Sequence, residues 1–224
     1  MTDNEFILFD RLQKIKSTVE KYGEENFYIS YSGGKDSNVL SALFDMALPD
    51  NKIPRVYCDT GIEQNAVRDF VREKAAHDDR FIIIQPKVPI KKMLETVGYP
   101  FKSKYHSRNV YQNANHNYNV LDKGNLSVTK YLGIIKEEKC KEERLCPKRL
   151  RYQFEKPIAF KISDKCCDEL KKKPFKEYEK QTKRYYPIIG LLASEGGAES
   201  KHKMYCRSKG NNTFSSFSTY YKGF

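Results

Sequence analysis

The sequence predicts an α/β fold: a doubly wound parallel sheet with helices on both faces. Three segments rich in β-forming residues, 26–32, 54–59 and 81–85, alternate with segments in which apolar residues have helical spacing. The first two strand segments each end at a glycine turn, so strand, turn and helix follow one another twice. Strands that alternate with helices in this way form parallel sheets through right-handed crossovers. Ligands of such sheets bind at the carboxyl ends of the strands, where both turns are expected.

An amphipathic helix is predicted to open the chain and to cover one face of the sheet. Its apolar residues recur at steps of three and four among charged residues, at Phe6, Phe9, Leu12, Ile15 and Val19. After the first strand, Gly33 and Gly34 form a turn, and the apolar residues between Val39 and Met46 have helical spacing again. The second strand ends at Asp59, and a helix is expected over 63–76.

The second half of the chain is less regular. Six asparagines with little periodicity lie between 109 and 125, which favours an exposed loop or lid over about 105–130. A Lys-rich helix is expected over 168–183, and a last strand over 186–192. The residues from 208 to 224 have no recognisable period.

Length and composition restrict the class of protein. The 224 residues fit one domain or a domain with an appendage, and 39% hydrophobic residues are enough for an ordinary core. The longest apolar runs are too short to span a bilayer. The first six residues lack the basic start and long apolar stretch of a secretory signal, so we expect no membrane association and a cytoplasmic location. The six cysteines are then expected to be reduced.

The positive charge is concentrated in the second half. Residues 1–122 hold 17 Lys and Arg against 17 Asp and Glu, whereas residues 123–224 hold 24 against 12. Such a surface suits a polyanionic partner, nucleic acid first, and scattered lysines on a solvated face are the alternative.

The turn after the first strand has the composition of a phosphate cradle. Ser32-Gly33-Gly34-Lys35-Asp36-Ser37 lies between a predicted strand and a predicted helix, where helical amides and the positive end of the helix dipole favour an anion. The glycines allow close approach of a phosphate, the serines and Lys35 add donors, and Asp36 could hold a divalent ion or cap the helix. The sequence around this turn matches neither the Walker pattern nor the Rossmann glycine pattern.

This hexapeptide closely resembles the pyrophosphate loop of the adenine-nucleotide α-hydrolase superfamily, which includes ATP pyrophosphatases, tRNA thiolation enzymes and PAPS/APS reductases. Further segments, in family order, resemble its PAPS reductase-like branch, including members found in phages and mobile elements. They are Val56–Gly61, Gly98–Lys104, Ile162–Cys167 with 171–174, and Ile188–Gly190. The resemblance defines a nucleotide-binding domain over 1–206 and leaves 207–224 as an unassigned tail.

The resemblance implies roles for particular residues. The nucleotide cofactor, ATP or a PAPS/APS-type nucleotide with Mg²⁺, is expected at Ser32, Gly33, Gly34, Asp36, Ser37, Asp59 and Thr60. Lys35 and Asp36 are the candidate catalytic residues, and Ser103, Lys104 and His106 are candidate substrate contacts. The chain departs from the family at 194–199, where acidic and small residues replace basic and polar ones, and it lacks the Glu-Cys-Gly nucleophile of sulfonucleotide reductases.

The cysteines suggest a second cofactor. Cys166, Cys167 and Cys206, with Cys146 or Cys140 as a fourth thiolate, could hold an iron–sulfur cluster, and burial in the core is the alternative.

Three functions therefore remain open. The chain could be an enzyme that cleaves ATP to AMP and pyrophosphate and so activates a nucleic-acid or small substrate for sulfur or nitrogen transfer. It could be a sulfonucleotide reductase-like enzyme, or an inactive nucleotide-binding module that needs a partner. The expected partners are an adenine nucleotide, tRNA or DNA bound through the second half, and a second copy of the chain or another protein.

Overall fold

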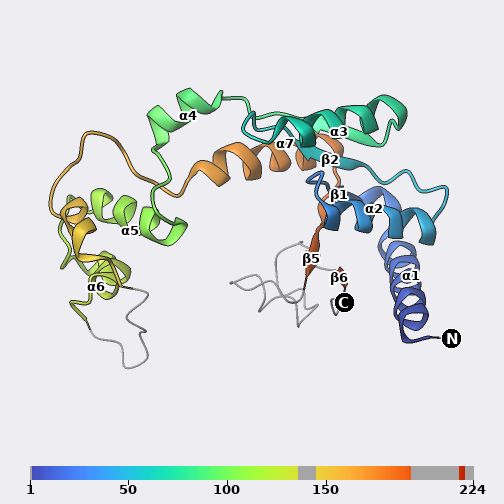
Figure 1. The fold of residues 1–224 in the computed structure, drawn as a ribbon, viewed down its shortest axis with the longest axis horizontal. Coiled ribbons are helices and arrows are strands. Elements are labelled where there is room, and N and C mark those ends of the chain that lie inside the picture. Colours follow the sequence, from blue (N-terminus) through green and yellow to red (C-terminus); the bar gives the residue numbers. More distant parts are fainter. Residues whose placement is uncertain (1, 136–144, 193–216, 220–224) are drawn as a thin grey trace. The chain divides into compact units, whose positions relative to one another are not determined.

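The computed structural model describes residues 2–135, 145–192 and 217–219 (Figure 1). Tertiary contacts divide the chain into two compact units. We call residues 1–86 with 173–224 the sheet unit and residues 87–172 the helical unit. The sequence predicts one domain over 1–206, whereas tertiary contacts divide these residues between the two units.

The sheet unit confirms an α/β fold with an all-parallel sheet. Its four strands have the order β3-β2-β1-β4, and every neighbouring pair is parallel. The strands are β1 (Phe27–Ser30), β2 (Arg55–Cys58), β3 (Phe81–Ile84) and β4 (Tyr186–Ile188). Because β1 lies between β2 and β4, the strand order reverses beside β1, and this architecture is compatible with a Rossmann-like domain.

Helices cover both faces of this sheet. Successive strand residues point to opposite faces, so Ile29 packs into a cluster with α1 (Asp3–Tyr22) and α2 (Lys35–Ala47), while Tyr28 packs against Tyr178. Tyr178 lies on α7 (Lys173–Thr182), and α3 (Asn65–His77) packs against β2 and β3 through a third cluster. The short 3₁₀ helix η1 (Glu24–Asn26) leads into β1.

The predicted last strand is divided in two. β4 ends at Ile188, and β5 (Gly190–Leu192) pairs in parallel with β6 (Phe217–Thr219), which belongs to the tail that the sequence left unassigned. Gly190 lies against the start of α2, because a Cβ added at this glycine would be only 3.0 Å from the carbonyl oxygen of Asp36. The Ile-Gly segment therefore lies directly beside the glycine turn.

The helical unit overturns the prediction of a loop over 105–130. Most of this range is helical, in α5 (Lys104–Asn115), η2 (Lys123–Asn125) and α6 (Leu126–Tyr131). The other elements of the unit are α4 (Ile90–Val97), the 3₁₀ helix η4 (Lys148–Phe154) and the π-helix η5 (Asp168–Lys172). Within the described part of the chain, no helix is both long enough and apolar enough to cross a bilayer.

The asparagines that suggested a loop form a buried polar core instead. Asn109, Asn113 and Asn125 are all fully buried. The Asn113 amide donates to the Phe154 carbonyl oxygen at 2.8 Å, and the Asn125 amide donates to Asn113 at 3.1 Å. These side chains satisfy buried backbone and side-chain groups, so they belong to helices although they break the apolar pattern.

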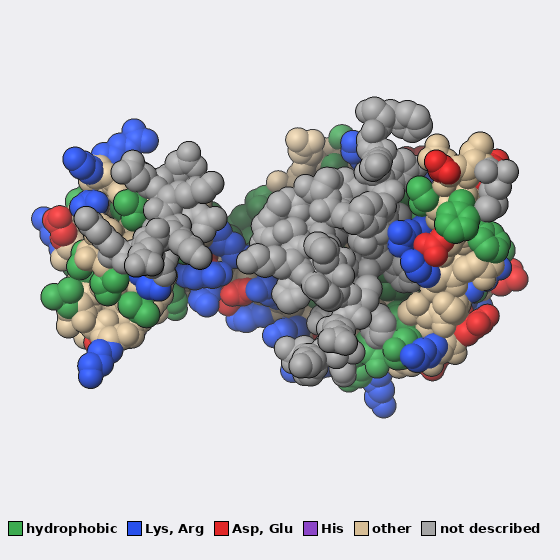
Figure 2. Space-filling model, turned by 90° about the horizontal axis from the view of Figure 1, so that it is seen from below, with side chains coloured by type: hydrophobic (Ala, Val, Ile, Leu, Met, Phe, Trp, Pro, Cys, Tyr) green, Lys and Arg blue, Asp and Glu red, His purple; other side chains and the backbone are tan. Residues whose placement is uncertain are grey.

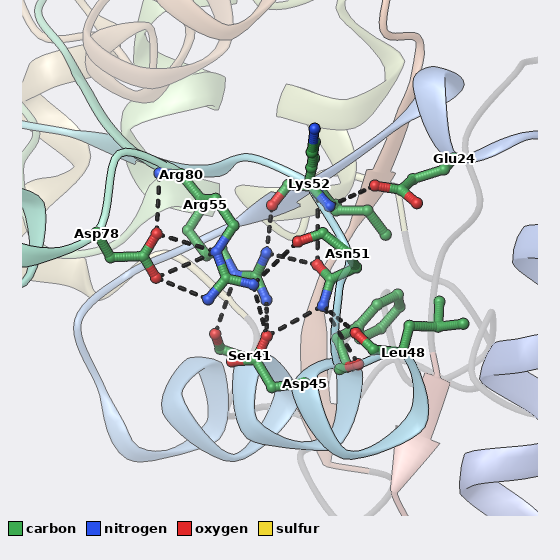
Figure 3. Close-up of polar contacts among 11 residues, drawn as sticks. Glu24, Ser41, Asp45, Leu48, Asn51, Lys52, Arg55, Asp78 and Arg80 are labelled. Atoms are coloured by element: carbon green, nitrogen blue, oxygen red, sulfur yellow. Dashed lines mark hydrogen bonds and ion pairs between the residues drawn. The ribbon is translucent and has the colours of Figure 1, made fainter.

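One buried arginine joins α2 to the sheet (Figure 3). Arg55 in β2 is 0% exposed, and it donates to Ser41 and Asp45 of α2 at 3.1 and 2.7 Å. It also donates to Asn51 and to the carbonyl oxygen of Ile53. Arg80 reaches the same Asp45 oxygen at 2.8 Å, so one carboxylate on α2 holds two guanidinium groups.

We predict that Asp45→Ala destabilises the protein by about 3 kcal/mol, because it leaves a buried guanidinium without its counter-charge. Asp69→Ala is the matched control, since the pair of Asp69 with Arg72 is exposed and contributes about 0.5 kcal/mol or less. Urea unfolding of both variants checks the difference. Equal losses in the two variants would contradict the role given to Arg55.

Candidate functional site

The glycine turn lies where a nucleotide site is expected in a sheet of this order. Residues 31–34 connect the carboxyl end of β1 to the first residue of α2, and β1 is the strand beside which the order reverses. In open parallel sheets, ligands bind in the crevice at this point.

The backbone of the turn requires glycine at one position. Gly33 has φ +76°, in the left-handed region that favours glycine, and a Cβ there would meet Val67 at 2.7 Å and Val71 at 3.1 Å. The backbone at Gly33 is therefore packed closely against Val67 and Val71 of α3.

Among the described residues, Gly34 has open space on its own side. A Cβ added at Gly34 would have only the Ser32 hydroxyl of these residues within 4 Å, at 3.4 Å. Gly34 is the N-cap of α2, and no side chain in 2–135, 145–192 or 217–219 caps this helix end. The first amides of a 13-residue helix are thus left for another acceptor.

A small hydrogen-bonded clamp fixes the turn. The Ser32 hydroxyl donates to Ser37 at 3.1 Å and accepts from the Gly34 amide at 3.3 Å. Asn38 donates to the carbonyl oxygens of Gly33 and Gly34, and it accepts from the hydroxyl of buried Tyr31 at 2.6 Å. Tyr31 and Asn38 are not among the residues that the sequence indicated, and only their positions flanking the hexapeptide could have indicated them.

Both charged residues of the turn lack an ion pair within the described part of the chain. Lys35 is exposed and Asp36 is partly exposed. Asp36 was predicted either to cap the helix or to hold a divalent ion, and it does not cap α2. Its carboxylate is therefore available to a cation.

Asp59 and Thr60 lie at the carboxyl end of the neighbouring strand β2, but their side chains already have partners. Asp59 is buried and lies 3.4 Å from Arg68 and 3.6 Å from Arg72, and it accepts from the Gly61 amide at 3.0 Å. The hydroxyl of Thr60 donates to Glu63 at 2.7 Å. Both residues are in place beside the turn, and neither presents an unpaired polar group to it.

The three predicted substrate residues lie in the helical unit and have different environments. Ser103 is the N-cap of α5 and accepts from the His106 amide at 3.1 Å, and Lys104 is exposed. His106 is 0% exposed: its Nδ1 lies 2.9 Å from the Tyr131 hydroxyl and its Nε2 lies 2.8 Å from Gln153 Oε1. Burial lowers the pKa of His106, so the ring is a neutral part of the core. We leave His106 out of the proposed site.

The cysteines do not assemble into a metal centre in the part of the chain that the structure describes. Cys146 is buried, its thiol lies 3.6 Å from the Pro147 carbonyl oxygen, and burial raises its pKa. Cys166 and Cys167 are partly exposed at the start of the helical segment that contains η5. Within 2–135, 145–192 and 217–219, no group of three or more Cys, His, Asp or Glu side chains could hold a metal ion. Cys140 and Cys206 lie outside the described residues.

Comparisons with known proteins add no family to this geometry. No protein-family model matches the chain, and no curated protein matches it.

The cluster hypothesis predicts iron bound in a stoichiometry that falls when Cys166 and Cys167 become serine. Thiolate-bound iron–sulfur clusters absorb broadly in the visible range, so the anaerobically purified protein should be brown. Iron analysis and absorption spectra of wild type and Cys166→Ser/Cys167→Ser check this, with Cys58→Ser as the control because Cys58 lies inside β2. A colourless, iron-free protein after anaerobic reconstitution would refute the cluster.

Proposed function

We propose that the glycine turn binds ATP with Mg²⁺ and that the protein cleaves ATP to AMP and pyrophosphate, activating a substrate for sulfur or nitrogen transfer. The observation that carries this proposal is the open, uncapped amino end of α2 at the point where the strand order reverses. The resemblance of 32–37 to the pyrophosphate loop of PAPS reductase-like proteins supports the choice of nucleotide.

The residues of the turn fit such a ligand. The space beside Gly34 admits a phosphate next to the first amides of α2, and these amides with Lys35 are its donors. The Ser32 hydroxyl, which donates to Ser37, would join them by turning to the phosphate. Asp36 is the carboxylate that would hold Mg²⁺, which prefers oxygen ligands and binds through one or two carboxylates. Bound there, the ion would neutralise the charge that develops on pyrophosphate.

A nucleotide-binding module without turnover is the second candidate, and one observation favours it. The superfamily resemblance gives Asp59 a place near the ribose or the ion, whereas here Arg68 and Arg72 neutralise its carboxylate. A site in which Asp36 is the single free carboxylate among the described residues could bind a nucleotide without cleaving it. The resemblance alone also keeps a sulfonucleotide reductase-like activity open.

Nucleic acid is the substrate class that the charge favours. In the described parts of the helical unit, 87–135 and 145–172, there are 16 Lys and Arg against 6 Asp and Glu. Blue Lys and Arg side chains outnumber red Asp and Glu side chains on the face of this unit that Figure 2 shows on the left. A tRNA or DNA substrate would be held there by phosphate contacts that weaken with salt.

Gly34→Val is expected to weaken ATP binding at least about tenfold, because it displaces phosphate contacts that contribute about 1.5–3 kcal/mol each. Ala42→Val is the control, since it places the same side chain at an exposed position of α2 away from the turn. Calorimetry with ATP and a nonhydrolysable analogue, with and without Mg²⁺, measures both variants. Asp36→Ala should remove the magnesium dependence. Wild-type affinity in Gly34→Val would exclude the turn as the cradle.

If the protein turns over, we expect AMP and pyrophosphate as products, because the proposed attack is at the α-phosphate. Chromatography of the reaction separates these products from ADP and orthophosphate. Asp36→Ala should abolish the release while Ala42→Val keeps it. Tight ATP binding without any product, with tRNA or DNA present, would favour the inactive module, and release of ADP would contradict the proposed chemistry.

A further inference from the structure

The outer face of α5 lines a cavity within the helical unit. Lys104, Arg108, Tyr111 and Asn115 recur at steps of four, three and four, so they share one side of the helix. The opposite side, with His106, Asn109, Val110 and Asn113, is buried in the core of the unit. The segment 164–172 forms the other wall, and the cavity has a volume of about 350 Å³. This volume is within the range of small-molecule sites.

Charge pairs line this cavity but leave it positive. Arg108 Nε lies 2.8 Å from Asp164, and Lys172 Nζ lies 2.7 Å from Asp168. These two carboxylates face four cationic side chains, the other two being Lys104 and Lys165. Lys165 is only loosely paired, at 3.9 Å from Asp168, and Lys104 has no carboxylate partner among the described residues.

An aromatic face lies beside Lys165, one of the two loosely held lysines. Lys165 Nζ lies over the Tyr111 ring, 5.6 Å from its centroid, and this ring is partly buried in the wall. A base that stacks on this face would displace the ammonium, which could then bind the phosphate. An aromatic face accepts a stacked base whatever the base is, and nearby lysines bind phosphate as point charges. The cavity therefore offers the two kinds of contact that one nucleotide needs.

Asp164 supplies a further contact. Its side chain is 6% exposed, and its Oδ2 is held by Arg108, while its Oδ1 has no hydrogen-bond partner in the described part of the chain. A buried acceptor without a donor is costly. A sugar hydroxyl or base amine in the cavity is a donor that could satisfy it after a small side-chain adjustment.

We propose that this cavity binds a single nucleotide, with its phosphate on Lys104 and Lys165 and its base on Tyr111. The nucleotide is either free or an unpaired unit of a nucleic acid, since both present the same chemistry. All residues of the site belong to the helical unit, so it shares no residue with the glycine turn of the sheet unit and does not rest on the function proposed for that turn.

The test removes the two lysines in a Gly34→Val background, in which binding at the glycine turn is weakened equally in the variant and in its control. Lys104→Gln/Lys165→Gln is compared with Lys91→Gln/Lys92→Gln, which removes the same charge from exposed positions of α4 in the same unit. Two probes are used at low salt. Binding of AMP is measured by calorimetry, and binding of a fluorescein-labelled single-stranded RNA is measured by fluorescence anisotropy. We expect the first variant to bind at least one probe about tenfold or more weakly than the control, because contacts to charged groups are lost.

The two probes identify the source of the nucleotide. A loss confined to AMP indicates a free nucleotide, and a loss that includes RNA indicates a nucleic-acid unit. Tyr111→Ala should also weaken binding of that probe while Tyr111→Phe retains it, which gives an independent test if the lysine variant fails to fold. The proposal is overturned if the lysine variant binds both probes as tightly as its control, or if Tyr111→Ala binds them like Tyr111→Phe.

Discussion

The buried guanidinium of Arg55 is the constraint on which the sheet unit depends. A charge that is 0% exposed is tolerated only when its hydrogen bonds are satisfied, and the donors of Arg55 are used on α2 and on the segment before β2. Figure 3 shows Arg80 joining the same carboxylate of Asp45. The second half of α2 is thereby fixed against the sheet. Because α2 is a rigid helix, the direction of its uncapped amino end, which begins at the glycine turn, is fixed with it.

The elements around this turn could be predicted from the sequence because local signals agree with the fold there. The helix expected over 63–76 is found at Asn65–His77, and the strand expected over 81–85 at Phe81–Ile84. Apolar spacing and glycine punctuation determine such boundaries. The last strand shows the limit of these signals. Its apolar run continues past Gly190, but the chain leaves the main sheet after Ile188, and that change depends on a partner strand 27 positions further along the chain.

The helical unit could not be predicted for a different physical reason. Both faces of α5 are polar: one carries buried His106, Asn109 and Asn113, and the other carries Lys104 and Arg108. A hydrophobic pattern cannot distinguish a buried face from an exposed face when both are polar. The spacing of the buried side chains was nevertheless helical, at steps of three, one and three from 106 to 113. Hydrogen bonding, and not apolar burial, gives that face its place in the core.

The candidate nucleotide site likewise has a part that the local sequence specifies and a part that depends on tertiary contacts. The cradle consists of backbone amides and two glycines, so local sequence is sufficient to specify it. The ion pairs of a side chain such as Asp59 depend on partners brought from α3, and Arg68 and Arg72 are nine and thirteen residues away. A divalent cation near Asp59 would lie close to the guanidinium groups of Arg68 and Arg72. In the described part of the chain, no arginine forms an ion pair with Asp36. Like charges repel strongly in a partly buried site, so the electrostatics favour Asp36 over Asp59 as the ligand of the cation. The sequence of the hexapeptide alone could not predict this preference.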